Sequence, residues 1–178
     1  MDVRIELATR DCVFALWESV ALGVWRGKTT VGALRRAGQI LLQYSAERAS
    51  PVLLLTVVEE SAPLPTLEAR MELVKFLKTS NSIVERHGLV FEGEGFRAAS
   101  IRAVVAGVAL FSRPEYPYRV FGSVGAATRF LAAGKNGQLA PHRLLRMVSE
   151  ARRQQGTQTM LPWMTPVPSV GEPVRSRQ

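Results

Sequence analysis

Few residues in this chain combine the type and the spacing that catalysis requires. The segment Gly27-Lys28-Thr29-Thr30 resembles the end of a phosphate-binding loop, in which backbone N–H groups surround a phosphate. The full pattern needs a glycine five residues before Gly27, and that position holds Leu22. A threonine that caps the following helix explains the segment better, so we infer no nucleotide site.

The other acidic, imidazole and thiol groups do not form a catalytic set either. Glu92 and Glu94 lie in a glycine-rich turn that opens a helix, where interaction with the helix dipole explains them. His87 and His142 are far apart without nearby acidic ligands, and His87 is expected to end a helix. Cys12 is the only cysteine, which excludes an internal disulfide and a cysteine metal cluster. We therefore expect a protein that is not an enzyme and that uses no cofactor or metal.

The elements of the chain are organised around the apolar run from 52 to 58, in the segment PVLLLTVVEE. A run this short and this apolar is typical of a strand buried on both faces, since a helix normally needs about ten residues or more. The strand-like segments 13–17 and 20–25 precede it. Residues 1–12 are polar and are expected to be a lead-in to the first strand.

Helices are predicted between the strands. Apolar residues at intervals of three and four predict helices that begin near Thr30 and Thr66 and end before Pro51 and at His87-Gly88. A helix over 96–112 is apolar nearly all round, which indicates that it is buried or covered by a partner. The alternation predicts an α/β fold with a single mostly parallel, mixed sheet of about five strands and crossover helices. The remaining predicted elements are strands at 89–91 and 118–121 and a helix at 124–132.

Length and composition indicate one soluble domain. The chain has 178 residues, of which 47% are hydrophobic and 21% charged, within the range of ordinary globular proteins. We place the domain at 13–134. No stretch of eighteen apolar residues occurs, and the charged N-terminus does not resemble a signal peptide. Cytoplasmic localisation is therefore expected.

The net charge of +8 is concentrated near the C-terminus. Residues 1–134 carry sixteen basic and thirteen acidic side chains, whereas residues 135–178 carry seven and two. We interpret 135–155 as a linker and a basic amphipathic helix, and 156–178 as a proline-rich, disordered tail. The helix is expected either to dock on its own domain with a solvated basic face or to meet an anionic partner. Its candidate basic surface consists of Arg143, Arg146, Arg152 and Arg153.

The order of elements and several segments together resemble a known family. Two opening strands, a helix after VWRGKTT, a strand at PVLLLTVVEE and the closing segment YRVFGSVGAATRFLA are similar to STAS/SpoIIAA-like domains, which are related to SEC14 lipid-transfer domains. The closing segment is the most suggestive, because members often end with a valine–phenylalanine strand, a serine and a helix with paired alanines. The resemblance covers about residues 13–134 and implies a divergent member with a STAS/SEC14-like fold.

The resemblance implies a bacterial regulatory or protein-interaction module without catalytic activity. Family antagonists of anti-sigma factors carry a phosphorylatable serine in an Asp-Ser-Ser/Thr-Gly segment at the start of the second helix. The corresponding segment here, EESAPLPTLEAR, lacks that Asp and Gly and contains two prolines. We therefore do not expect this protein to use the family's phosphorylation switch. A protein partner is expected at 61–70, which comprises the loop after the central strand and the start of the second helix, with Glu60, Ser61, Thr66 and Arg70 as candidate contacts.

Other functions stay open at this point. The SEC14 side of the resemblance, together with the apolar helix at 96–112, favours a carrier of a lipid or small apolar ligand. The basic helix favours an adaptor for nucleic acid or a membrane surface. Phe14, Trp17 and Trp25 alternate with smaller residues in the opening strands, which predicts either core packing or a homodimer interface.

Overall fold

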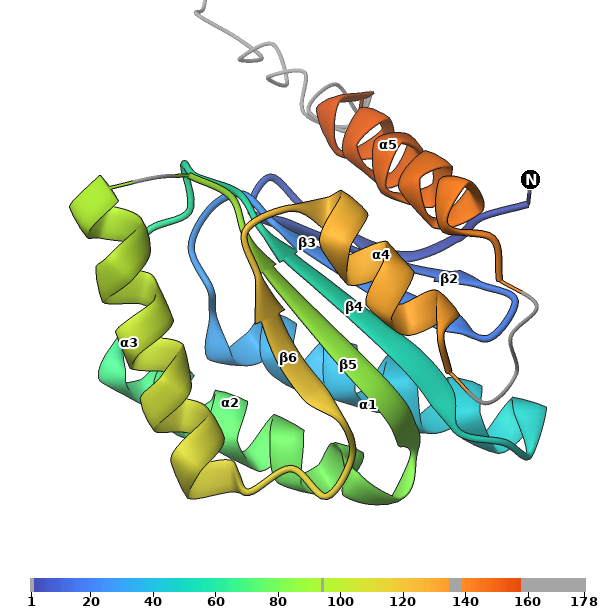
Figure 1. Ribbon diagram of the computed structural model, residues 1–178, viewed down its shortest axis with the longest axis horizontal. Helices are drawn as coiled ribbons and strands as arrows, with labels where there is room; N and C mark the ends of the chain where they lie inside the picture. Colours follow the sequence, from blue (N-terminus) through green and yellow to red (C-terminus); the bar gives the residue numbers. More distant parts are fainter. Residues whose placement is uncertain (1, 94, 135–138, 158–178) are drawn as a thin grey trace, which may run out of the picture.

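The apolar run Val52–Val58 forms β4, inside a six-stranded sheet (Figure 1). The computed structural model describes residues 2–93, 95–134 and 139–157. Within these residues the strands lie side by side in chain order, and the single sheet with crossover helices confirms an α/β protein. The other strands are β1 (Arg4–Ala8), β2 (Cys12–Trp17), β3 (Val20–Trp25), β5 (Val84–Phe91) and β6 (Tyr118–Phe121).

The sheet is mixed, with an antiparallel beginning and a parallel remainder. β1, β2 and β3 pair antiparallel, and β3 to β6 pair parallel. β2, β3 and β4 are almost wholly buried because helices cover both faces of the sheet. Burial on two faces explains why these strands appear in the sequence as continuous apolar runs.

The prediction that residues 1–12 form only a lead-in was wrong. Arg4–Ala8 forms β1, which pairs with β2 and raises the strand number from about five to six. Charged Arg4 and Glu6 alternate with the partly buried Ile5 and Leu7, and alternation with charge is typical of an edge strand. Because β1 is an edge strand and carries charged residues among its apolar ones, its sequence pattern did not stand out as a strand.

Three crossover helices lie on one face of the sheet (Figure 1). They are α1 (Val31–Arg48), α2 (Leu67–Thr79) and α3 (Gly95–Ser112). Right-handed connections between strands that advance in one direction place the connecting helices on the same face. The predicted caps of the first two helices are confirmed, since Thr30 and Thr66 accept the backbone N–H groups of Ala33 and Ala69.

The opposite face of the sheet is covered by α4 (Val124–Ala132) and α5 (Pro141–Thr157) (Figure 1). Ser123 caps α4 as its sequence predicts. The apolar face of α5 lies in the same core cluster as the inward side chains of β3 and β4. This helix is therefore joined to the main core of the protein. Its buried residues are Leu144, Met147, Val148 and Ala151.

The predicted helix end at His87-Gly88 was also wrong. α2 ends at Thr79, a short 3₁₀ turn (Ser80–Ser82) follows, and β5 begins at Val84. Gly88 lies within this strand, where an added Cβ would be 3.4 Å from the Cβ of Ala127. The glycine thus allows α4 to lie close to the sheet and does not cap a helix.

Candidate functional site

The carboxyl ends of the parallel strands, where α/β proteins commonly bind ligands, are closed here by ion pairs. Glu59, which follows β4, accepts two hydrogen bonds from Arg26, with Nε 2.7 Å and Nη2 3.2 Å from the carboxylate oxygens. Arg152 of α5 reaches the same edge, where its Nε lies 3.0 Å from Glu59 Oε1 and its Nη2 2.6 Å from Glu92 Oε2. The carboxylates of Glu59 and Glu92 at this edge are therefore paired with arginines of the same chain.

A depression of about 530 Å³ lies at this edge between the segment after β3 and the loop after β4, where its lining includes Thr30, Leu64 and Thr66. A ligand crevice forms where neighbouring strands send their connections to opposite faces of the sheet. From β3 to β6 the strand order does not reverse, and α1, α2 and α3 all lie on one face. This depression therefore does not lie at a topological switch point of the kind where α/β proteins commonly bind ligands.

Of the four predicted contact residues, Glu60, Ser61 and Thr66 lie in the loop from β4 to α2 and Arg70 lies in the first turn of α2, and their surroundings differ. Ser61 is exposed, and its hydroxyl donates to the carbonyl oxygen of Arg26 at 3.0 Å. Glu60 is exposed beside Gly93, and Thr66 serves as the cap of α2. Arg70 is half-buried and its Nε donates to the Pro65 carbonyl oxygen at 2.9 Å. The loop is thus held at both of its ends.

The segment Gly27–Thr30 is occupied by the protein's own carboxylate. The backbone N–H of Lys28 donates to Asp11 Oδ1 at 3.0 Å, and a Cβ on Gly27 would lie 1.9 Å from that oxygen. Thr30 caps α1. A carboxylate therefore already holds the place that a bound phosphate would need, which agrees with a helix start and not with a nucleotide loop.

A wide apolar groove of about 650 Å³ lies between α2 and α3. Several of the large side chains beside it are open to solvent: Leu67 is 71% exposed, Met71 59%, and Phe111 73%. Leu110, next to Phe111, is 72% exposed. Isolated exposed apolar residues are common, whereas a contiguous patch marks an interaction surface. The apolar lining consists of Leu67, Met71, Val74, Val104, Val108 and Phe111.

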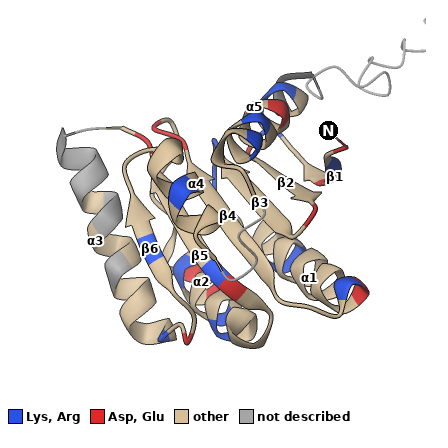
Figure 2. Cartoon of the chain, turned by 45° about the vertical axis from the view of Figure 1, so that its right-hand side comes forward, with Lys and Arg blue, Asp and Glu red and all other residues tan. Residues whose placement is uncertain are grey.

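The charge around this groove has one sign. Arg70, Lys75 and Lys78 of α2 line it, and no acidic residue does so among the described residues. Residues 103–112 of α3 contain no charged residue, and the described part of that helix is drawn without charge in Figure 2. The acidic Glu72 of α2 lies on the α1 side, where its Oε1 is 3.2 Å from the Nε of Arg35. Lys75 lies between the two sides, because its Nζ is also 3.7 Å from Glu72 Oε2.

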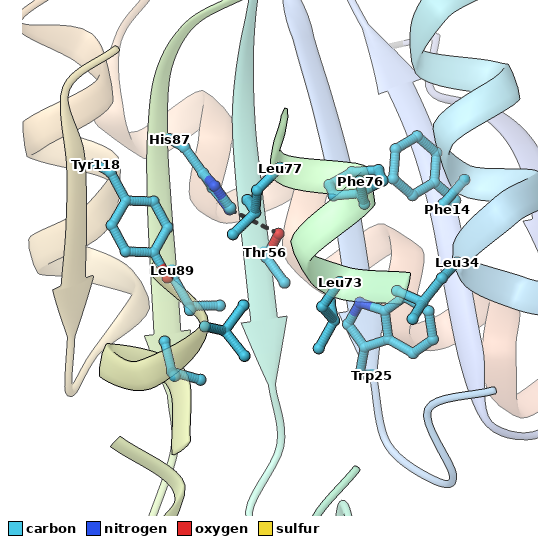
Figure 3. A pocket seen from close by; sticks show the side chains of 13 residues that line it. Phe14, Trp25, Leu34, Thr56, Leu73, Phe76, Leu77, His87, Leu89 and Tyr118 are labelled. Atoms are coloured by element: carbon cyan, nitrogen blue, oxygen red, sulfur yellow. Dashed lines mark hydrogen bonds between the residues drawn. The ribbon is translucent and has the colours of Figure 1, made fainter. Parts of the chain in front are cut away.

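A second, enclosed cavity lies between the sheet and the three helices α1, α2 and α3 (Figure 3). His87 of β5 points across the sheet toward Thr56 of β4, with Nε2 3.0 Å from the threonine hydroxyl. The imidazole is only 3% exposed, and burial lowers its pKa to about 3. Burial also raises the pKa of Tyr116 and of Tyr118. All three groups are therefore neutral at pH 7.

The size of the cavity limits what it can hold. Its volume is about 60 Å³, whereas a cavity that binds benzene measures roughly 150 Å³. The lining is almost wholly apolar apart from Thr56, His87 and Tyr118. In this conformation the cavity has no room for a lipid chain.

The four basic residues predicted on the C-terminal helix do not form one free surface. Arg143 pairs with Glu18 at 2.8 Å, and its guanidinium carbon lies 4.6 Å from the centre of the Trp17 ring. Arg152 pairs with Glu59 and Glu92 at the sheet edge, and Arg153 pairs with Glu150. Arg146 is exposed. Three of the four are therefore engaged with acidic groups of the same chain.

The aromatic residues of the opening strands are part of the core. Phe14, Trp17 and Trp25 are 3%, 5% and 7% exposed, respectively. Phe14 and Trp25 line the enclosed cavity, and Trp17 lies in the cluster that includes α5. Their alternation is therefore explained by core packing on the two faces of the sheet.

The exposed apolar residues of the α2–α3 groove were not predicted from the sequence. Leu67 and Met71 stay exposed, because the face of α2 that packs on the sheet and on α1 is formed by Ala69, Leu73, Phe76 and Leu77. The apolar character of α3 on all sides was the available signal, because it indicated a buried helix or one that a partner covers.

The described residues contain no group of three His, Cys, Asp or Glu side chains arranged to hold a metal ion. Among the described helices, none combines the length and the apolar character needed to cross a bilayer. Comparisons of this chain with protein-family models, with curated proteins and with solved structures found no match.

Proposed function

We propose that this protein is a non-enzymatic regulatory or protein-interaction module that binds its partner in the groove between α2 and α3. The observation that carries the proposal is the cluster of exposed apolar side chains along that groove, with Leu67, Met71 and Phe111 each more than half exposed. Burying such side chains against a partner contributes roughly 1.5–3 kcal/mol each when burial is complete. The groove therefore offers apolar side chains whose burial against a partner would favour binding.

The proposed surface overlaps the loop expected from the sequence only at its end. Glu60 and Ser61 lie at the sheet edge, whereas Arg70 lines the groove. The resemblance of YRVFGSVGAATRFLA to STAS/SpoIIAA-like domains supports an interaction role. The missing phosphoacceptor motif indicates that recognition depends on shape, apolar contact and charge.

The two other functions have less support. A carrier of a lipid or apolar ligand needs an internal space, and the enclosed cavity of about 60 Å³ is too small for one in this conformation. An adaptor for nucleic acid or a membrane needs free cations on α5, and Arg143 and Arg152 are paired with acids. We therefore rank both below the interaction module.

A groove-filling variant tests the proposal. An added Cβ at Gly107 would meet no atom within 4 Å, so Gly107→Leu places a side chain in the groove without displacing the core. We expect affinity purification from the native host to lose the specific partner when Gly107→Leu replaces the wild-type protein. If every protein captured by the wild type is also captured by Gly107→Leu, the groove is not the binding site.

Gly32→Leu is the matched control. Gly32 lies near the start of α1, away from the groove, and its added Cβ also meets no atom within 4 Å. Both substitutions replace a helical glycine by leucine, and both raise helix propensity. Only the variant in the groove is expected to lose the partner.

A further inference from the structure

The α2–α3 groove has a shape and a charge that restrict the kind of partner. We infer that its partner is an acidic amphipathic helix, whose apolar face lies in the groove and whose carboxylates meet the cations of α2. This inference rests on the function proposed above and adds the chemical class of the partner. Its observations are the length of the groove, the nature of its two walls and the sign of its charge.

The groove is long enough for several turns of a helix. Its lining on α2 runs from Leu67 to Lys78, a distance of about 16 Å at 1.5 Å per residue. On α3 the lining runs from Ala103 to Phe111. A bound helix of about three turns would match this length and would present apolar residues at intervals of three and four.

Both walls of the groove are helices, and this favours a helical partner over an extended one. The backbone groups of a helix interior are paired within the helix itself, so these walls offer no row of free N–H and C=O groups. An extended peptide would leave its own backbone groups unpaired against such walls, whereas a helix satisfies them internally. The small residues Ala103 and Gly107 leave room for close approach to α3.

The charge of the groove selects an acidic partner. Arg70, Lys75 and Lys78 line one wall, and residues 103–112 of the other wall are uncharged. Lys75 lies 3.7 Å from Glu72, which lowers its share of the attraction, whereas Lys78 is exposed. Glu68 belongs to the depression beside Thr30 and not to this groove. Carboxylates on the α2 side of the bound helix would therefore meet Arg70 and Lys78, and Lys75 in competition with Glu72.

Charge also disfavours the two occupants that this chain could supply. A second copy offers the same groove, whose described lining carries Arg70, Lys75 and Lys78 and no acidic residue. The C-terminal segment 158–178 contains Glu172 as its single acidic residue, together with two arginines. Neither has the negative charge that the groove requires.

Two synthetic peptides of about 18 residues, long enough to be helical, test the inference. They share one face of leucines and differ only in the polar face, which is glutamate in one and lysine in the other. Fluorescence anisotropy with the full-length protein at low salt is expected to show about tenfold tighter binding of the acidic peptide, from two or three surface charge pairs. Added salt is expected to reduce this difference.

Variants connect the binding to the groove. Gly107→Leu is expected to weaken the acidic peptide by about tenfold or more, because it fills the apolar contact, and Gly32→Leu is expected to leave it unchanged. Ala103→Leu is a second groove-filling variant if Gly107→Leu does not fold by circular dichroism. Lys78→Glu is expected to weaken the acidic peptide about threefold to tenfold, whereas Arg146→Glu on the opposite face of the sheet has no effect.

Each outcome decides between the alternatives. Equal binding of the two peptides, or binding that Gly107→Leu does not change, overturns the inference. Vesicles of phosphatidylcholine and phosphatidylglycerol that bind the wild type but not Gly107→Leu, in the absence of peptide binding, would identify a membrane as the partner and also overturn it. The proposed function fails separately, when the native partner remains bound to Gly107→Leu.

Discussion

Replacement of Leu144 by alanine tests whether α5 belongs to the main core. Leu144 has no exposed surface and lies in the cluster that contains the inward side chains of β2, β3 and β4. The neighbouring Leu145 is 40% exposed on the same helix. Both substitutions remove the same atoms from a leucine, so the difference between them reports burial alone.

The expected cost follows from this difference in burial. Truncation of a fully buried leucine costs about 2–5 kcal/mol, because burial is lost and a cavity remains. Substitution of a surface residue such as Leu145 usually changes the free energy of unfolding by about 0.5 kcal/mol or less, since no enclosed cavity is left behind. We therefore expect Leu144→Ala to lower the free energy of unfolding by about 2–4 kcal/mol more than Leu145→Ala.

Urea denaturation followed by circular dichroism measures both variants. The midpoint is expected to fall for Leu144→Ala at an unchanged slope, and to stay near the wild-type value for Leu145→Ala. A difference between the two variants of less than about 1 kcal/mol would refute the shared core, because the lower bound for a buried leucine is about twice that.

The same reasoning applies to removal of the whole helix. Leu144, Met147 and Val148 are each at most 2% exposed, and their full burial contributes about 1.5–3 kcal/mol each. The sum is comparable to the entire stability of a typical domain, which is about 5–15 kcal/mol. A fragment that ends at Gly134 is therefore a poor test of an adaptor role, and substitution of exposed Arg146 is a better one.

Two further predictions concern buried polar groups. Burial lowers the pKa of His87 from 6.5 to about 3, so the unfolded chain takes up the proton first and stability is lost as pH falls below 6.5. This group alone lowers the free energy of unfolding by about 1.4 kcal/mol per pH unit. Urea titrations from pH 6.5 downward are expected to show a shallower decline in the free energy of unfolding for His87→Leu than for the wild type. An equal decline in the two proteins would contradict this prediction. Arg152→Ala removes the guanidinium that contacts Glu59 and Glu92, and we expect it to cost about 1–3 kcal/mol, against about 0.5 kcal/mol or less for exposed Arg146→Ala. Thermal unfolding measures this pair, and equal melting temperatures for the two variants would show that the sheet-edge ion pairs do not stabilise the fold.

The fold class could be predicted from the sequence because the patterns that indicate strands and helix starts are local. The apolar run 52–58 indicated a strand covered on both faces, and hydroxyl residues at 30, 66 and 123 marked helix starts. Each of these signals depends on a few neighbouring residues. The strand β1 was missed because its pattern alternates charged and apolar residues over only five positions.

The candidate site could be predicted from the sequence only in part. The loop 61–70 was correctly placed after the central strand, but its polar residues Ser61 and Thr66 bond to backbone groups of the protein. The groove was missed because it depends on which face of α2 meets the sheet. The spacing of apolar residues indicates only approximately which side of a helix faces the core. If the helix turns about its axis by the angle of one residue, different leucines become buried.

The sequence by itself predicted an α/β protein with a central buried strand and with helices that begin near Thr30, Thr66 and Ser123. The tertiary structure decided that His87 lies inside the sheet, that Arg152 closes the sheet edge, and that Met71 stays exposed beside α3. The physical reason is that a strand or helix forms from the pattern of its own residues, whereas burial and charge pairing depend on elements distant in the chain. Arg152 and Glu92 are sixty residues apart in sequence, and only the docking of α5 brings them into contact.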